Sequence, residues 1–494
     1  MIHLLLPLPI AAPILLAAIA FLLRARLSAQ RGCAFVGAAI VGVSGLALLD
    51  ANLRDGIQVT AIADHPAPFG IVLVADVLSA LMTLVNGIVG VAVVLYRDRE
   101  AESQPVFHPL LLALLAGTSG AFLTGDLFNF YVWFEIAVAA SLGLLVLGGR
   151  PEQIDAGIKY AVLNVFAASA LLFGIGLVYA GAGTLNFADL ARSLPELSDS
   201  GLLLGMAVTL LVALGCKAAV FPLYFWLPAS YHTGAFAVGA ILSGLLTKIG
   251  VYALYRVFLI VFPAQLAELR AVFFALAALT MVTGVLGAAA QTEIRRILAF
   301  HVISQVGYLV MGLALLTPSG VAGGVFYMVH VIVVKTNLFL VGGLAYRLLG
   351  TSELSRMGGL VRNAPGAALL FALSAAAIAG IPPLSGFWAK LFVVYAGIQV
   401  EVYWLSALAL GVGVLTLYSM TKIWQFVFWG ASPEAGMRES VQSVRPAYLP
   451  AALLALGILA VGIYPRGLLR VAELAAVQMI ERTGYVDAVL RGGR

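Results

Sequence analysis

The chain has 494 residues, of which 62% are hydrophobic and only 10% are charged. A water-soluble protein of this length needs more polar surface than this composition supplies, so the soluble globular classes are excluded. The net charge of +5 says little, because the placement of charges matters more than their sum in a membrane protein. Continuous apolar runs of roughly 20 residues predict membrane-spanning helices rather than a barrel. The expected fold class is an all-α polytopic membrane protein.

Hydropathy predicts about fourteen spans joined by short loops, with no large soluble domain. The tail after Pro465 mixes charged residues with leucine and valine, which predicts an amphipathic helix at the membrane interface. The first residues lack the basic segment of a cleaved signal peptide, so the first span is expected to be retained. In chain order, the expected spans cover residues 2–23, 32–49, 71–96, 107–124, 127–148, 157–180, 201–228, 234–262, 268–290, 297–317, 320–348, 366–398, 402–429 and 447–465.

Arginines divide the loops into a rich side and a poor side. By the positive-inside rule the rich side is cytoplasmic, which places both termini outside. The poor side holds Arg54, Arg192, Arg256 and Arg270. The rich side holds Arg24, Arg26, Arg31, Arg97, Arg99, Arg150, Arg295, Arg296, Arg347, Arg356, Arg362, Arg438 and Arg445.

Motifs for bound cofactors are missing from the sequence. It contains no Walker loop, no HExxH pair and no GxGxxG after a strand. Cys33 and Cys216 both lie in apolar segments, which argues against a disulfide framework and against a thiolate metal site. We therefore expect no cofactor, no metal and no nucleic-acid partner, and any redox or ATP chemistry must come from another protein.

Prolines interrupt two of the expected spans. Pro222 lies in 201–228, and Pro382 and Pro383 lie in 366–398. The surrounding residues echo each other, Pro-Leu-Tyr-Phe-Trp against Pro-Leu-Ser-Gly-Phe-Trp. Five spans separate the two, so they have opposite orientations if every span crosses. Paired broken helices in two inverted halves indicate a transport site near the bilayer midplane, although simple proline kinks would give the same pattern.

All six lysines lie within or at the edge of an apolar span, whereas the arginines occupy loops and tails. Arginine stays protonated under any tolerable condition, but a desolvated lysine can lose its proton. A buried lysine beside a movable acid is therefore a protonation switch. Two of the six, Lys159 and Lys422, lie near span ends, where snorkelling to the interface is the better interpretation.

Glu135 is the only glutamate deep inside an apolar span, and Lys217 is its most plausible partner. A charge at that depth costs at least ~2.5–3.5 kcal/mol unless it is paired or hydrated. The pair is either a working pair or a static lock between two helices. Lys248 lies in mid-span, and Lys390 follows the second proline break; for Lys390, snorkelling remains an alternative.

Four polar residues, His301, Ser304, Gln305 and Tyr308, draw one stripe along an apolar helix. Such a stripe either joins helices to each other or lines a hydrated path. His330 and Lys335 point about 140° apart on an ideal helix, so one path includes both only through a bulge or through the reach of the lysine.

Two carboxylates, Asp76 and Asp126, open expected spans and are interpreted as helix caps. Elsewhere, no cluster of carboxylates is dense enough for a dehydrated sodium ion, which favours a proton-only role for this chain.

At these residues the sequence resembles the antiporter-like subunits. This family includes the large subunits of Mrp-type sodium/proton antiporters and the proton-pumping membrane subunits of respiratory complex I and related hydrogenases. The resemblance rests on Glu135, Lys217 and Lys248, and on two segments. These are residues 295–308 (RRILAFHVISQVGY) and 379–390 (AGIPPLSGFWAK). The resemblance covers nearly the whole chain. Within the family, the chain length and the Phe-His-Val-Ile-Ser-Gln sequence are most similar to the Mrp D subunit.

The resemblance implies two inverted five-helix repeats, 107–262 and 268–429, after N-terminal helices in 1–106 and before a last helix and tail in 430–494. It implies that Glu135 and Lys217 are a working pair, with Lys248 and His330 or Lys335 carrying protons toward Lys390. It also implies partners, namely the other membrane subunits of such a complex in the cell membrane.

Three functions stay open at this point. The first is a proton-translocating subunit of a multi-subunit Na⁺/H⁺ antiporter, which is a transporter rather than an enzyme. The second is a proton-pumping subunit of a complex I-like quinone reductase or a membrane-bound hydrogenase. The third is a stand-alone solute transporter, which would normally carry fewer buried lysines.

Overall fold

The computed structural model describes residues 2–197, 199–431 and 437–492. Eleven described helices are long and apolar enough to cross a membrane, and three shorter apolar helices accompany them. The long ones are α3 (Leu27–Asp55), α4 (Val77–Tyr96), α7 (Leu127–Leu145), α8 (Pro151–Ala182), α10 (Ser200–Ala218), the run α12–η3–α13–η4 (Phe236–Val261), α15 (Arg270–Ala290), α16 (Ile294–Ala314), α17 (Pro318–Leu349), α21–η6 (Tyr403–Trp429) and α22 (Val441–Ile463). The shorter ones are α2 (Leu8–Leu22), α6 (Phe107–Leu123) and α19 (Pro365–Ala379).

Each expected span overlaps one of these helices, and the predicted helical fold class is confirmed. The number of membrane crossings and the two inverted repeats stay predictions. The remaining described elements are α1 (Ile2–Leu5), β1 (Gln58–Ala61), η1 (Ile62–Asp64), β2 (Val72–Ala75), α5 (Arg99–Glu102), α9 (Phe187–Ser193), η2 (Leu194–Glu196), α11 (Trp226–Ser230), α14 (Pro263–Glu268), η5 (Leu354–Arg356), α18 (Leu360–Asn363), α20 (Ser385–Gln399), α23 (Pro465–Glu481) and α24 (Thr483–Gly492).

One small sheet departs from the hydropathy reading. Strands β1 and β2 pair antiparallel, with Gln58 opposite Ala75 and Ala61 opposite Val72. The expected span 71–96 therefore divides into a strand and a helix that begins at Val77. The apolar run concealed this boundary, because hydropathy does not distinguish a buried strand from the end of a buried helix.

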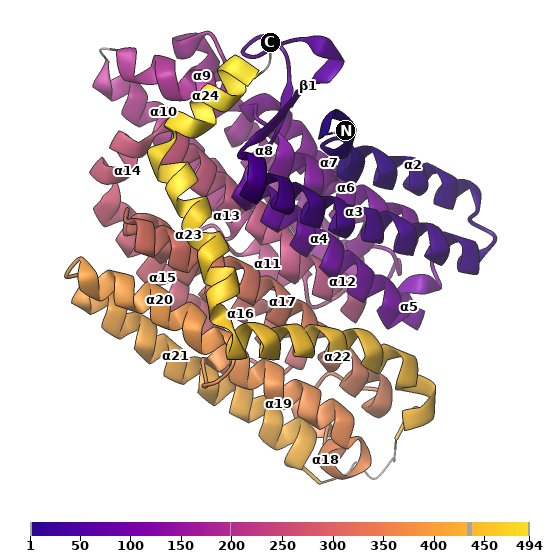
Figure 1. Cartoon of the computed structure of the whole chain (residues 1–494). Coiled ribbons are helices and arrows are strands. Elements are labelled where there is room, and N and C mark those ends of the chain that lie inside the picture. Colours follow the sequence, from indigo (N-terminus) through magenta and orange to yellow (C-terminus); the bar gives the residue numbers. More distant parts are fainter. Residues whose placement is uncertain (1, 198, 432–436, 493–494) are drawn as a thin grey trace.

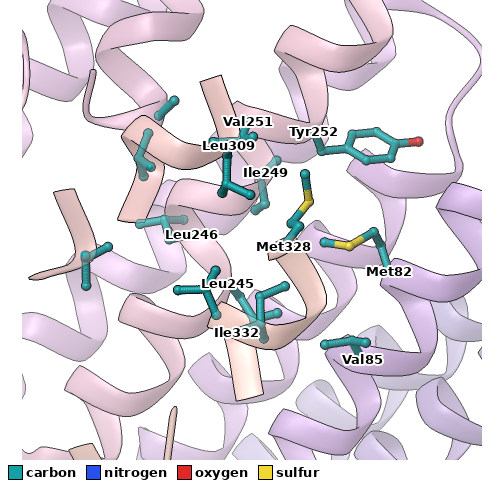
Figure 2. Packing of buried hydrophobic residues seen from close by; sticks show 14 of the residues in the cluster. Met82, Val85, Leu245, Leu246, Ile249, Val251, Tyr252, Leu309, Met328 and Ile332 are labelled. Carbon is teal, nitrogen blue, oxygen red and sulfur yellow. The ribbon is translucent and has the colours of Figure 1, made fainter. Parts of the chain in front are cut away.

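The centre of the bundle is formed by α16, α17 and the run Phe236–Val261. Of the residues in the most apolar part of each segment, 94%, 94% and 100%, respectively, are buried within the chain. Figure 2 shows where they meet α4: Leu245, Ile249, Leu309, Met328 and Met82 converge on one another. Since lipid tails are as apolar as leucine, close packing rather than hydrophobicity holds such helices together.

Figure 1 shows α2 and α3 at one side of this centre and α19 and α21 at the other. The tail helices α23 and α24 run across the bundle, from the end of α22 to α9. α23 packs on α17 and α4, and its buried residues include Ala472, Ala476 and Met479. The predicted place of this tail at the membrane interface stays a prediction.

Both proline segments lie between helices. Helix α10 ends at Ala218, Ala219 adopts the left-handed conformation (φ 60°), and α11 begins only at Trp226, so Pro222 lies in non-helical chain. Helix α19 ends at Ala379, and α20 begins at Ser385. Gly380 (φ 95°) turns the chain between them, a conformation that favours glycine. Pro382 and Pro383 follow Gly380, before α20 begins.

A buried ion pair joins α4 to α13. Asp76 caps α4 by accepting a hydrogen bond from the backbone N–H of Ser79 at 2.9 Å, as the sequence predicted. The same carboxylate accepts hydrogen bonds from Nη1 and Nη2 of Arg256, which also donates from Nε to Tyr252. The assignment of Arg256 to an outer loop was wrong, because the α-helix continues through it into the π-helical η4 and buries its side chain.

The substitution Asp76→Asn should destabilise the protein strongly, because it leaves the Arg256 guanidinium buried without a counter-charge. Removing one partner of a buried pair costs roughly 3–5 kcal/mol. Thermal unfolding of the purified protein in a bilayer mimetic measures the effect. The control is Asp50→Asn, which breaks a pair with Arg54 whose side chains are 57% and 73% exposed and should cost below about 1 kcal/mol. Equal, small shifts for both variants would contradict the prediction.

Candidate functional site: a belt of buried amines

Glu135 of α7 and Lys217 of α10 form a direct ion pair. Lys217 Nζ lies 2.7 Å from Glu135 Oε1 and 4.8 Å from the centroid of the Phe134 ring. The two partners are buried unequally, since the Lys217 side chain is 0% exposed and that of Glu135 is 31% exposed. Lys217 lies in the last turn of α10, where unpaired carbonyl groups favour a cation. Trp226 Nε1 donates to the Cys216 carbonyl at 2.9 Å and ties the two sides of the break together.

Lys248 lies immediately after a π-helical turn, η3. Its amine is fully buried and donates to the carbonyl of Ser243 at 2.6 Å. A π-helical turn shifts the backbone hydrogen-bond register and is often found at functional positions. Here an oxygen of that turn becomes the partner of the amine. Gly244, in the same turn, lies so close to α17 that a Cβ placed there would be 2.5 Å from Thr336 Oγ1.

His330 and Lys335 of α17 contact different helices. His330 Nδ1 lies 2.9 Å from Ser385 Oγ, at the start of α20, and Lys335 Nζ lies 3.5 Å from the carbonyl of Leu298 in α16. Both side chains are buried. The divergence follows from their spacing of five residues on one helix. α17 therefore presents His330 to α20 and Lys335 to α16.

Lys390 reaches back across the second helix break. Its Nζ donates to the carbonyl of Ala379, the last residue of α19, at 2.8 Å and lies 5.5 Å from the centroid of the Tyr308 ring. The side chain is buried, and it borders a cavity of about 330 Å³ between the break and α21. This geometry places the cation at a helix C-terminus, where the macrodipole stabilises it. Lys390 does not reach outward, so the snorkelling alternative is not what the structure shows.

The polar stripe on α16 is wholly buried and makes contacts on two sides. His301 Nε2 lies 2.7 Å from Ser419 Oγ, and Tyr308 donates from its hydroxyl to the Ala409 carbonyl at 2.6 Å, both on α21. Gln305 accepts a hydrogen bond from the hydroxyl of Tyr327, whose ring stacks on Tyr308 with centroids 5.0 Å apart. The stripe thus joins helices, as one of the two interpretations held.

Several atoms of this region also lack partners. We call the buried lysines and the polar side chains around them the belt. Within the described residues, six buried side-chain atoms of the belt accept or donate no hydrogen bond. They are His301 Nδ1, Ser304 Oγ, Gln305 Nε2, His330 Nε2, Thr247 Oγ1 and Asn337 Oδ1. Buried polar groups nearly always find a partner, either protein or ordered water. The region therefore combines helix-joining contacts with buried polar atoms that no group of the described chain satisfies.

The two remaining lysines have separate roles. Lys159 is exposed and lies 2.5 Å from Asp155, in keeping with a side chain at a span end. For Lys422, snorkelling stays a prediction. Lys422 donates to the carbonyls of Ala289 and Gln291, at 3.0 and 2.7 Å, and so caps the C-terminus of α15. Asp126 caps α7, as predicted, by accepting from the N–H of Asn129 at 2.8 Å.

Metal binding finds no support in the described geometry. In residues 2–197, 199–431 and 437–492, no three His, Cys, Asp or Glu side chains lie close enough together to hold an ion. What the belt offers chemically is a set of amines, one carboxylate and imidazoles, all of which exchange protons.

Residues 124–416 match the family model described as the NADH:quinone oxidoreductase/Mrp antiporter transmembrane region. The chain belongs to this antiporter family. It is 40% identical to the D subunit of the Na⁺/H⁺ antiporter of Alkalihalophilus pseudofirmus, over 98% of this chain and 99% of that protein. It is 36% identical to the corresponding D subunit of Bacillus subtilis, again over 98% and 99% of the two chains.

Chains of two solved membrane complexes have the same architecture. A chain of the Mrp complex from Dietzia sp. DQ12-45-1b superposes with a TM-score of 0.92, at 31% identity and over 99% of both chains. A chain of respiratory complex I from Thermus thermophilus superposes with a TM-score of 0.81, at 25% identity, over 97% of this chain and all of that one. The likeness to the Mrp chain is the stronger of the two.

Proposed function

We propose that this protein is the D-type, proton-translocating subunit of a multi-subunit Na⁺/H⁺ antiporter. Support comes from the two bacterial D subunits, which match this chain from end to end, and from the superposition on the Mrp complex chain. One structural observation carries the mechanism. Four lysine amines are buried in the apolar interior, and each is bound to an oxygen that its own chain supplies. The partners are the other membrane subunits of the complex.

The Glu135–Lys217 pair is the switch in this proposal. When the pair is closed, the carboxylate stabilises protonated Lys217. When Glu135 moves away, the charged amine loses the carboxylate beside it, and its proton passes to Lys248. From there it passes through His330 or Lys335 to Lys390. A lysine suits each of these positions because it can release a proton, which arginine cannot.

Water connects these groups in the proposed pathway. Each of the four lysines donates to an oxygen of a carbonyl or carboxylate group, and within the described part of the chain none of them donates to another lysine. Helices pack with axes about 8–10 Å apart, so a side chain rarely spans the gap alone. The unpartnered atoms of His301, Ser304, Gln305 and His330 supply the polar wall that ordered water needs.

The topology is part of the proposal. Residues 107–262 and 268–429 form two inverted five-helix repeats, and each contains one broken helix with a lysine at or just beyond the break. The arginine-rich loops face the cytoplasm, which places both termini on the outer side of the cell membrane.

Substituting either member of the switch should abolish transport. Glu135→Ala leaves Lys217 without an anion, and Lys217→Ala removes the amine, so ion-driven proton flux in vesicles containing the intact complex should fall by at least about tenfold for each. The matched control is Lys159→Ala, which removes an exposed lysine and should leave the flux unchanged. Survival of the flux in both switch variants would show that the mechanism is wrong.

A second test asks whether Lys390 must release its proton. Lys390→Arg keeps the positive charge but removes the ability to deprotonate, so proton flux should be lost although the complex still assembles. Lys422→Arg is the control, because a helix cap needs only a cationic donor. Unaltered flux with Lys390→Arg would make Lys390 a structural residue.

The subunits and cofactors that purify with the chain distinguish an antiporter from a redox-driven pump. We expect other membrane subunits and no flavin or iron–sulfur absorbance, and we expect vesicles containing this chain alone to show little or no exchange. A bound flavin or iron–sulfur subunit would favour the complex I-like function. Full exchange by the isolated chain would favour a stand-alone transporter.

A further inference from the structure

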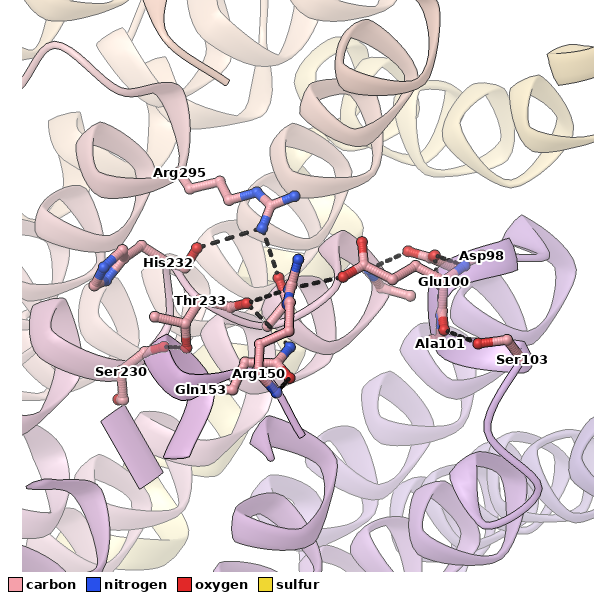
Figure 3. A network of polar contacts seen from close by, with 12 residues as sticks. Asp98, Glu100, Ala101, Ser103, Arg150, Gln153, Ser230, His232, Thr233 and Arg295 are labelled. Carbon is pink, nitrogen blue, oxygen red and sulfur yellow. Dashed lines mark hydrogen bonds and ion pairs between the residues drawn. The ribbon is translucent and has the colours of Figure 1, made fainter. Parts of the chain in front are cut away.

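The loop of residues 231–235 lies in the chain between Lys217 and Lys248, the first two lysines of the pathway. It follows α11, the second part of the broken span of Lys217, and precedes α12, the start of the run that contains Lys248. With only five residues, the loop keeps the end of α11 close to the start of α12. Figure 3 shows this loop inside a network of charged side chains.

Three consecutive carbonyl groups of the loop are held by side chains from two other helices. Arg295 Nη1 of α16 donates to Gly234 O at 3.0 Å and to His232 O at 3.4 Å. Arg150 Nη2 and Gln153 Nε2 of α8 donate to Thr233 O at 2.9 and 3.2 Å. The loop is thus held from one side by α8 and from the other by α16 (Figure 3).

Arg295 is held rigidly in this position. It is 6% exposed, and its guanidinium carbon lies 4.2 Å from the centroid of the Phe236 ring and 4.7 Å from that of Tyr346. A planar guanidinium can contact aromatic faces while its edge donates hydrogen bonds, a combination that lysine cannot reproduce. Arg295 therefore connects α16 to the loop with little freedom of its own.

The same helix contacts Lys390 at its other end. The Tyr308 ring of α16 is the one that faces the Lys390 amine. Thirteen residues separate Arg295 from Tyr308, which is about 20 Å along a helix. α16 is one uninterrupted helix from Ile294 to Ala314 and is buried over nearly its whole length, so both contacts are made by the same packed element.

We propose that Arg295 is a positioning residue that couples the two ends of the pathway, transmitting displacements of α16 at Lys390 to the loop between Lys217 and Lys248. This inference rests on the proposed function. It assigns a role to Arg295, the first residue of the 295–308 segment, which the proton pathway itself does not use.

The neighbouring Arg296 makes a different kind of contact. Its Nη2 lies 3.2 Å from His232 Nε2, and His232 Nδ1 lies 2.9 Å from the Pro228 carbonyl. Because a guanidinium only donates, His232 accepts at Nε2, and burial and the nearby Arg296 lower the pKa of His232. The Arg296 side chain is 49% exposed, and it holds a side chain rather than the backbone of the loop.

Hydrogen exchange in the intact complex tests the coupling. The Thr233 N–H donates to Ser230 O at 3.2 Å, so its exchange reports opening of the loop. Lys390→Gln should change the exchange rate of the loop peptide by at least about threefold when Arg295 is present, within the range of measured couplings. The same substitution should have no measurable effect on this rate in an Arg295→Gln background.

Two further variants make the result decisive. Arg347→Gln removes another mostly buried arginine of the same region, which donates to Glu439 and Ser443, and should leave the Lys390 effect intact. Arg295→Lys keeps the charge without the planar fork, should fold even if Arg295→Gln does not, and should also lose the effect. The proposal is overturned if Lys390→Gln alters the loop equally without Arg295, or if it does not alter the loop in the otherwise unchanged complex.

The two proposals fail separately. If Lys390→Arg abolishes proton flux but exchange in the loop responds without Arg295, only the coupling role of Arg295 is wrong. If flux is indifferent to Lys390→Arg, the proposed proton pathway is wrong, whatever the loop does.

Discussion

An amine buried in an apolar helix bundle needs an oxygen atom, and at two of the buried lysines irregular backbone supplies that oxygen. An intact α-helix already uses its carbonyl groups within itself, so it has few to offer. Lys390 binds the last carbonyl of α19, and Lys248 binds a carbonyl of a π-helical turn. The first oxygen is available because α19 ends beside Lys390, and the second because the hydrogen-bond register of the helix shifts beside Lys248. Broken helices and buried lysines are in this sense one structural feature.

This dependence separates Lys217 from the other lysines of the belt. Its partner is a carboxylate carried by a different helix, whereas Lys248, Lys335 and Lys390 donate to backbone carbonyls. A carbonyl is a fixed dipole that the fold keeps in place, but a carboxylate is a full charge on a side chain with rotatable bonds. A change of side-chain rotamer can therefore alter the charge balance at Lys217, while the environment of the other three changes only when helices move.

Much of this arrangement could be predicted from the sequence, because lysine in an apolar span is rare and its cost is large. The approximate helix positions and the partnership of Glu135 with Lys217 followed from composition and depth alone. What could not be predicted depends on contacts between distant segments. The Asp76–Arg256 pair joins the beginning of one helix to the end of another, 180 residues apart. The cap that Lys422 forms could not be predicted for the same reason, because it depends on the packing of α15 against α21.

The exposed part of Glu135 lies on the outer wall of the chain. Phe128 and Val132 precede it on the same face of α7, and they are 45% and 37% exposed. Whatever covers this wall, whether acyl chains or another polypeptide, sets the local dielectric around the carboxylate and so the strength of its attraction for Lys217. The electrostatic state of the pair is therefore a property of the assembled membrane complex. A change of detergent or of lipid composition therefore alters the attraction between Glu135 and Lys217 as well as the conditions of the preparation.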